Sequence, residues 1–239
     1  MSFSTWTPRA VATNAARASA RLWRAVEAQH IASTRRLVDD LEEQRALEEI
    51  LEATKPAVPL AAKNLHYLLY TPFRYPPATG TRFRAPDDPG VFYGSETVRT
   101  ACAELGYWRW RFLIDSKGLA SLGPAQQTLF EVGVRTLTID LEKSPFARDA
   151  RRWQDPGHYA ATQALGKAAR AAGVGLIRYR SVRDPEPGRC GAVLRPDAFS
   201  SPKPIGPAQT WLLTVTRSFA TWQRDREAFE FDMRRWVQA

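Results

Sequence analysis

The stretch between Tyr70 and Phe112 concentrates residues that bind phosphate, stack on planar rings and stabilise positive charge. Four arginines, two tyrosines and one glutamate stand out in it: Arg74, Arg82, Arg84, Arg99, Tyr75, Tyr93 and Glu104. A guanidinium group binds phosphate through paired, charge-assisted hydrogen bonds, and a tyrosine ring stacks on planar or cationic rings. A carboxylate beside such a site can stabilise positive charge that develops on a sugar. The residue types therefore suit a ligand that carries both phosphate and a sugar.

The same residues also permit a plainer interpretation. Arg74, Arg82 and Arg84 would then form only an exposed basic rim, and Glu104 would pair with one of them. Exposed ion pairs are common and contribute little to stability. The residue types alone leave both interpretations open.

Several familiar catalytic motifs are absent from the sequence. It contains no Gly-x-x-x-x-Gly-Lys phosphate loop, no Gly-x-Gly-x-x-Gly, no His-Glu-x-x-His and no Gly-x-Ser-x-Gly. The histidines His30, His66 and His158 lack the spacing of metal ligands. Two cysteines, Cys102 and Cys190, make neither a disulfide framework nor a zinc cluster. We therefore expect no bound metal.

Five short motifs occur in a recognisable order. An arginine followed by tyrosine stands in Phe73-Arg74-Tyr75, and a Gly-x-Arg-Phe element follows in Gly80-Thr81-Arg82-Phe83. A proline–glycine turn then leads into a strand within Asp88–Ser95, and a Thr-Ala-x-x-Glu helix starts within Thr100–Glu104. Far downstream, Ile177–Arg183 contains a strand that ends in Arg-Ser. Together these motifs resemble the RES family, the toxins of bacterial type II toxin–antitoxin pairs.

The resemblance extends from about Leu65 to Thr221 and implies a fold, a substrate and a partner. The implied fold is α+β, similar to ADP-ribosylating toxins, with a split, mostly antiparallel sheet and flanking helices around an NAD cleft. Such proteins consume NAD, either by breaking the nicotinamide–ribose bond through hydrolysis or phosphorolysis, or by passing ADP-ribose to a target protein. The implied partner is a helix-turn-helix antitoxin, through which alone the protein would contact DNA.

The resemblance also assigns roles to individual residues. The implied catalytic group is Arg74, Tyr93 and Glu104, and the implied NAD-binding group is Arg74, Tyr75, Arg82, Tyr93 and Ser181. The arginines would hold the pyrophosphate or ribose, and a tyrosine would stack near the nicotinamide. Glu104 would stabilise the oxocarbenium-like ribose. Ser181 would hydrogen-bond the ligand or orient Glu104; the alternative interpretation is a structural serine at the end of a strand.

Composition sets the wider frame. The chain has 239 residues, with 44% apolar and 25% charged, which is typical of a globular domain and excludes disorder or a coiled coil over its whole length. Its net charge of +9 lies in residues 61–239, because residues 1–60 hold equal numbers of basic and acidic side chains. A basic surface permits nucleic acid, a polyphosphate ligand or an acidic partner. No apolar stretch has the length of a membrane helix and no signal segment is visible, so we expect a cytoplasmic protein.

The first 60 residues differ in amino-acid composition from the rest of the chain. Val11–Thr54 lacks glycine and proline and is rich in alanine, leucine, arginine and glutamate, which predicts two helices with a break near residues 32–34. Leu37, Leu41, Leu47 and Leu51 form an apolar stripe. We expect residues 1–60 to form a helical arm, either a solvated hairpin or a surface for homo-oligomerisation or partner docking, and residues 61–239 to form the catalytic domain.

The remaining elements are mixed. The pattern predicts helices over 96–113, 159–172 and 225–237, and strands over 132–141, 174–179, 192–194 and 210–215. In the first of these helices, Trp108 and Phe112 are four residues apart and are expected to face the core, with Arg109 solvated. Three functions remain: an NAD-degrading enzyme, an ADP-ribosyltransferase that modifies one protein, and a basic nucleic-acid-binding protein.

Overall fold

The computed structural model describes residues 6–28, 38–75 and 77–237. Its strands are β1 (Ala16–Glu27), β2 (Phe92–Ser95), β3 (Ser121–Asp140), β4 (Leu176–Arg180), β5 (Arg189–Val193), β6 (Ile205–Thr216), β7 (Phe219–Arg224) and β8 (Glu227–Asp232). Its helices are α1 (Pro8–Thr13), α3 (Leu41–Thr54), α4 (Tyr67–Arg74), α5 (Val98–Asp115), α6 (Ala150–Trp153), α7 (Ala160–Ala171) and α8 (Arg234–Val237).

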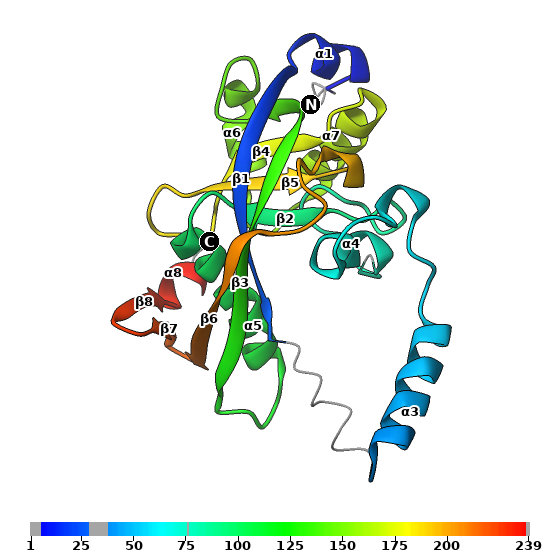
Figure 1. Cartoon of the computed structure of the whole chain (residues 1–239). Coiled ribbons are helices and arrows are strands. Elements are labelled where there is room, and N and C mark those ends of the chain that lie inside the picture. The colour runs from blue at the N-terminus through cyan, green and yellow to red at the C-terminus, as the bar shows by residue number, and fades with distance from the viewer. Residues whose placement is uncertain (1–5, 29–37, 76, 238–239) are drawn as a thin grey trace.

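The long strands β1 and β3 form the axis of the sheet. They pair antiparallel along the whole of β1, from Ala16 opposite Thr138 to Glu27 opposite Gln127. At one end, β2, β5 and β4 continue the pairing from β1 round to β3, so that these five strands close on themselves. At the other end, β6, β7 and β8 extend the sheet from β3 (Figure 1). The β3–β4 pairing is parallel and the others are antiparallel. The expected α+β class with a split, mostly antiparallel sheet is confirmed.

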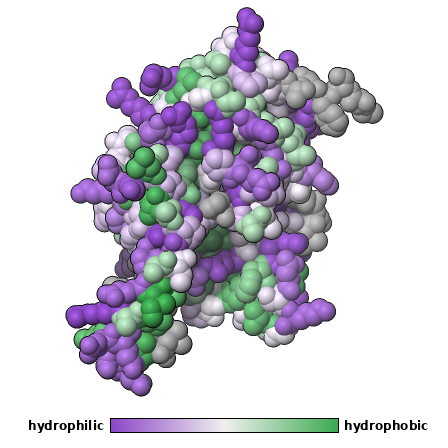
Figure 2. Space-filling model, turned by 90° about the vertical axis from the view of Figure 1, so that its right-hand side faces the viewer, coloured by the Kyte–Doolittle hydropathy of each residue, from purple (hydrophilic) through white to green (hydrophobic). Residues whose placement is uncertain are grey.

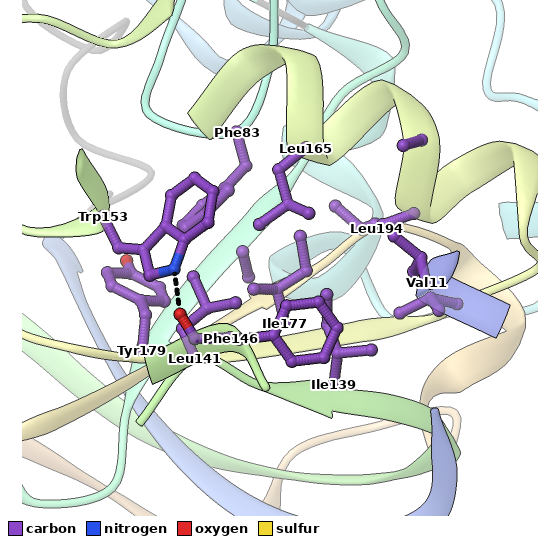
Figure 3. Packing of buried hydrophobic residues seen from close by; sticks show 14 of the residues in the cluster. Val11, Phe83, Ile139, Leu141, Phe146, Trp153, Leu165, Ile177, Tyr179 and Leu194 are labelled. Carbon is purple, nitrogen blue, oxygen red and sulfur yellow. Dashed lines mark hydrogen bonds between the residues drawn. The ribbon is translucent and has the colours of Figure 1, made fainter. Parts of the chain in front are cut away.

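Two clusters of buried hydrophobic residues pack beside α7 and α5. One lies under α7 and contains Trp153, whose indole N–H donates to the carbonyl oxygen of Phe146 at 2.8 Å (Figure 3). Gly166 lets α7 approach the turn before β2, because a Cβ there would lie 2.3 Å from the carbonyl oxygen of Phe83. The other lies between α5 and β6–β8 and gathers Trp110, Trp211, Trp222 and Trp236. Each cluster therefore anchors an element that carries a candidate site residue.

The prediction of helix throughout Val11–Thr54 is wrong for its central part. Residues 16–27 form β1, and only α1 and α3 are helical in the described portion of this segment; the predicted break and Leu37 lie outside it. Alanine and arginine favour helix locally, but pairing with β3 supplies a partner for the backbone that no local propensity reveals. Because β1 lies at the centre of the sheet, a boundary at residue 60 does not separate an arm from a catalytic domain. Within 1–60, the segment that does stand apart from the body is α3 (Figure 1).

Two further expectations are wrong. On α5, Trp110 is buried at 5% exposure, whereas Trp108 and Phe112 are each 55% exposed. The buried positions Gly106, Trp110 and Leu113 follow the face of the helix that meets the second cluster, and Trp108 lies off that face. The predicted helix over 225–237 is mostly β8, which pairs with β7, and becomes helical only at Arg234.

Candidate functional site

A cavity of about 230 Å³ lies between α5 and the closed five-stranded part of the sheet. Strands β1, β2, β4 and β5 contribute to its wall, as do the turn before β2 and the loop after β4. The lining residues used below are Arg24, Arg82, Tyr93, Glu104, Trp108, Tyr159, Tyr179, Arg183 and Cys190. Polar and aromatic side chains from distant parts of the chain therefore converge on one hollow.

Glu104 is the acidic residue of this cavity wall. It projects from α5, which begins after Thr97, whose hydroxyl accepts from the backbone N–H of Thr100 at 3.1 Å. The Ser181 hydroxyl donates to Glu104 Oε1 at 2.6 Å, and the Cys190 thiol donates to the same oxygen at 3.6 Å. Within the described chain, Oε2 receives no hydrogen bond, so this oxygen is free to meet a ligand.

The thiol of Cys190 is neutral in this setting. Burial raises its pKa well above the ordinary value, and the nearby Glu104 carboxylate raises it further. A protonated thiol donates a weak hydrogen bond, whereas a thiolate would repel the carboxylate. Cys190 therefore supports Glu104 and is not prepared to act as a nucleophile.

Ser181 stands just after β4 and is not itself a lining residue. Its hydroxyl oxygen accepts from the backbone N–H groups of Arg183 and Asp184, each at 3.1 Å. A hydroxyl has two acceptor positions and one hydrogen. The two backbone N–H groups occupy both acceptor positions of the Ser181 oxygen, and its single hydrogen is donated to Glu104. The geometry favours the orienting role for Ser181 over direct contact with a ligand.

Three arginines line the cavity and contact backbone carbonyls. Arg24 donates to the Tyr93 carbonyl at 2.8 Å, and Arg183 donates to the Pro156 carbonyl at 2.7 Å. Arg82 donates to the carbonyls of Trp153 and Asp155 at 2.8 and 2.9 Å. Carbonyl oxygens orient a guanidinium group but do not cancel its charge.

None of these three arginines forms an ion pair with any carboxylate in the described ranges. Burial lowers the pKa of Arg24 to about 10, which still leaves it charged at neutral pH. Arg82 lies over the ring of Tyr159, with 4.9 Å from its guanidinium carbon to the ring centroid. Three cations facing one carboxylate leave a net positive cavity, which suits a polyanionic ligand.

Tyr93 has a structural as well as a lining position. Its hydroxyl bonds with Thr81 Oγ1 at 2.8 Å and accepts from the Phe83 backbone N–H at 3.0 Å. Burial raises the pKa of Tyr93, so the hydroxyl stays protonated. These bonds hold the turn that carries Arg82 against β2. Stacking surfaces at the cavity also come from Trp108 and Tyr159.

The structure does not bring Arg74 and Tyr75 to this cavity. Arg74 ends α4, where its Nε donates to the Pro56 carbonyl at 2.6 Å and its guanidinium group pairs with Glu52 at 2.7 Å. Tyr75 stacks against Arg74, 5.3 Å from guanidinium carbon to ring centroid. Four of the six expected site residues, Arg82, Tyr93, Glu104 and Ser181, do gather at one place.

Sequence reasoning missed Arg24, Arg183 and Cys190. Arg183 stands in the Ile177–Arg183 motif, two residues after Ser181, so its position was visible but its role was not. Arg24 follows Leu22 and Trp23, an apolar pair in a segment whose composition predicts helix. Only the pairing of this segment with β3 shows that Arg24 lies on a strand and faces the cavity.

No group of three or more histidine, cysteine, aspartate or glutamate side chains that could hold a metal occurs among the residues that the structure describes. Across the same ranges, no helix combines the length and apolar character needed to cross a membrane.

The family model described as the RES domain matches residues 58–216. Among solved structures, the chain is similar to a chain in the crystal structure of the M. tuberculosis MbcT–MbcA toxin–antitoxin complex. The two share 13% sequence identity with a TM-score of 0.48, and the match covers 97% of this chain and 94% of that one. No curated protein matches the chain. The matched family segment contains Arg82, Tyr93, Glu104 and Ser181 but leaves Arg24 outside.

Proposed function

The chain belongs to the RES domain family, and from that membership and its cavity we propose that it cleaves the nicotinamide–ribose bond of NAD. One observation carries this proposal: Glu104, held by Ser181, faces a cavity lined by three arginines that have no carboxylate partner in the described ranges. NAD presents the matching groups, an anionic pyrophosphate and a ribose that becomes cationic when the bond to nicotinamide breaks.

The arginines would bind and orient the dinucleotide. Arg82 and Arg183 are buried and held by backbone carbonyls, so their donors keep a fixed direction. A pre-oriented guanidinium pair lowers the entropic cost of holding the pyrophosphate. The exposed ring of Trp108 and the ring of Tyr159 offer faces on which the nicotinamide or adenine can stack.

Glu104 would then stabilise the transition state. The bond between ribose C1′ and nicotinamide N1 breaks, its electron pair leaves with the now neutral nicotinamide, and positive charge develops on the ribose. The free Oε2 of Glu104 would lie beside that charge or accept a hydrogen bond from a ribose hydroxyl. Water, phosphate or a protein side chain then donates an electron pair to C1′ and loses its proton.

Incubation of the purified protein with NAD tests the proposal. We expect nicotinamide release, and a strong reduction of that release in Glu104→Gln, with the remaining product identified by mass spectrometry. ADP-ribose indicates hydrolysis, ADP-ribose phosphate indicates phosphorolysis, and labelled protein indicates transfer. No release by a folded protein in the presence of phosphate and cell extract would refute NAD cleavage.

A partner follows from the same proposal, since unrestrained NAD consumption would harm the cell that makes it. We propose that the chain is the toxin of a toxin–antitoxin pair and that a helix-turn-helix antitoxin restrains it. A partner that places acidic side chains or a C-terminal carboxylate near Arg24, Arg82 and Arg183 would compete with NAD. Co-expression with the adjacent open reading frame, followed by titrations with and without ADP-ribose, tests this. A partner affinity that ADP-ribose does not weaken would place the antitoxin elsewhere.

The nucleic-acid interpretation finds little support in α5. Arg109 pairs with Glu27 and Arg111 pairs with Asp115, so the two cations are already partnered. Trp110 is buried and offers no face to a base, and the exposed ring of Trp108 lines the cavity.

A further inference from the structure

The C-terminal helix α8 reaches the loop that follows β4. Trp236 is buried, and its indole N–H donates to the backbone carbonyl of Arg183 at 2.7 Å. That loop carries Ser181, which orients Glu104, and Arg183, which lines the cavity. Trp236 lies outside residues 58–216, the segment that the family model matches.

The ring of Tyr107 contacts both Trp236 and the side chain of Arg183. The guanidinium carbon of Arg183 lies 3.5 Å from the centroid of the Tyr107 ring. The Trp236 ring meets Tyr107 edge-on, with 5.4 Å between centroids and an interplanar angle of 83°. Edge-to-face aromatic packing and a cation over a ring are both favourable contacts. Arg183 is therefore held at its backbone by Trp236 and at its side chain by Tyr107.

On the other side of Arg183, Asp184 attaches the loop to α5. Its Oδ2 accepts from the Thr100 hydroxyl at 2.8 Å, and its Oδ1 pairs with Arg99 Nε at 3.3 Å. Thr100 lies one helical turn before Glu104 on the same helix. The loop is thus fixed between α5 and α8, at the carbonyl of the residue that lines the cavity and at the side chain of the residue that follows it.

We infer that Trp236 is a positioning residue of the candidate site. Its indole N–H and ring hold the loop so that Ser181 keeps Glu104 oriented and Arg183 presents its guanidinium group to an anionic ligand. This inference rests on the proposed function for the identity of the ligand, a pyrophosphate-bearing nucleotide. The hold on the loop itself is independent of the ligand.

The chain offers a matched control for the test. Trp222 is fully buried in the same cluster as Trp236, but its indole nitrogen has no hydrogen-bond partner among the described residues. Trp236→Phe and Trp222→Phe make the same chemical change, and only the first removes a donor to the loop. A merely structural role for Trp236 would make the two variants behave alike.

Hydrogen exchange at the backbone amides of residues 181–184 gives the ligand-free readout. We expect exchange there to be about tenfold faster in Trp236→Phe, the effect of one lost buried hydrogen bond, and unchanged in Trp222→Phe relative to its global stability. Equal exchange in the two variants would overturn the inference. Faster exchange in a protein that releases no nicotinamide would support the inference and refute NAD cleavage.

Binding gives the second readout. We expect Trp236→Phe to raise the Kd for ADP-ribose several-fold, and to raise KM for NAD more than it lowers kcat, while Trp222→Phe leaves both near wild type. Tyr107→Leu, which keeps the indole donor, should raise the same Kd without faster exchange at Asp184. An ADP-ribose Kd that neither Trp236→Phe nor Tyr107→Leu changes would overturn the positioning role.

Discussion

Ser181 donates its one hydroxyl hydrogen to Glu104, with 2.6 Å between Oγ and Oε1. The same oxygen accepts from the N–H groups of Arg183 and Asp184, so the protein supplies both of its acceptor contacts while its hydrogen is donated to Glu104. A residue at the end of a strand thereby sets the orientation of a carboxylate on a helix 77 positions earlier in the chain. Glu104 is left with one oxygen committed to the protein and one open to the cavity.

Replacement of Glu104 by glutamine keeps the shape and removes the charge. We expect nicotinamide release to fall by about 10²–10³, the usual cost of losing a preorganised electrostatic contact in a transition state. Thermal unfolding should change little, because the glutamine oxygen can still accept from Ser181. Turnover within about tenfold of wild type would show that Glu104 does not stabilise the charge.

Ser181→Ala should leave Glu104 in place but poorly oriented. We expect kcat to fall by about tenfold or more and stability to fall by about 1–3 kcal/mol, because two loop N–H groups lose their acceptor. Ser95→Ala is the control: its hydroxyl is also buried beside the cavity but bonds with Cys190 and not with Glu104. Equal loss of kcat in both variants would contradict an orienting role.

Substitutions of Arg24 and of Arg74 should affect the Kd for ADP-ribose differently. Arg24→Lys removes the fork of donors from the cavity, and we expect the Kd for ADP-ribose to rise by about tenfold, since charge-assisted hydrogen bonds contribute about 1.5–3 kcal/mol. Arg74→Lys should leave that Kd unchanged, because Arg74 contacts Glu52 and the Pro56 carbonyl away from the cavity. Calorimetric titration of both variants decides which arginine serves the site.

Alkaline pH should destabilise the fold through its two buried thiols. Burial raises the pKa of both Cys102 and Cys190 above their ordinary value of 9.0. Their contribution is complete below pH 9, where both states hold the proton, and it is lost as pH rises because the unfolded chain ionises first. Urea unfolding at pH 8 and pH 10 should differ by about 2–3 kcal/mol. The double variant Cys102→Ala/Cys190→Ala should show a smaller difference, and an equal one would contradict the assignment.

The helix α3 is expected to mediate self-association. Leu41 and Ile50 are 65% and 63% exposed on it, and in Figure 2 the projecting lobe at lower left shows hydrophobic and hydrophilic residues together. Ile50→Glu should lower the light-scattering mass of the protein and leave nicotinamide release unchanged. Leu60→Glu, at an exposed leucine outside α3, is the control. A wild-type protein that is monomeric at micromolar concentration would contradict this prediction.

Local pattern was sufficient for part of the site. Arg82, Tyr93 and Glu104 lie within one short stretch, and each stands on a turn, strand or helix whose identity nearby residues determine. The Thr-Ala-x-x-Glu motif begins on the first turn of α5, so its glutamate has a fixed place on that helix. Ser181 was identified by the resemblance to the RES family, and it directly follows β4.

Tertiary structure decided that Arg24, and not Arg74, lies at the cavity. Residues 16–27 have helical composition, but local propensities differ by less than about 1 kcal/mol per residue. Pairing of every residue of β1 with β3, a hundred or more positions away in sequence, outweighs these propensities and places Arg24 at the cavity. Arg74 has the expected neighbour in Tyr75, yet Glu52 and Pro56 draw its guanidinium group elsewhere. Sequence by itself determined the family, the α+β class and the local motifs. Long-range strand pairing decided which arginines line the cavity with Glu104, because the residues of one short segment do not specify the distant segment with which it pairs.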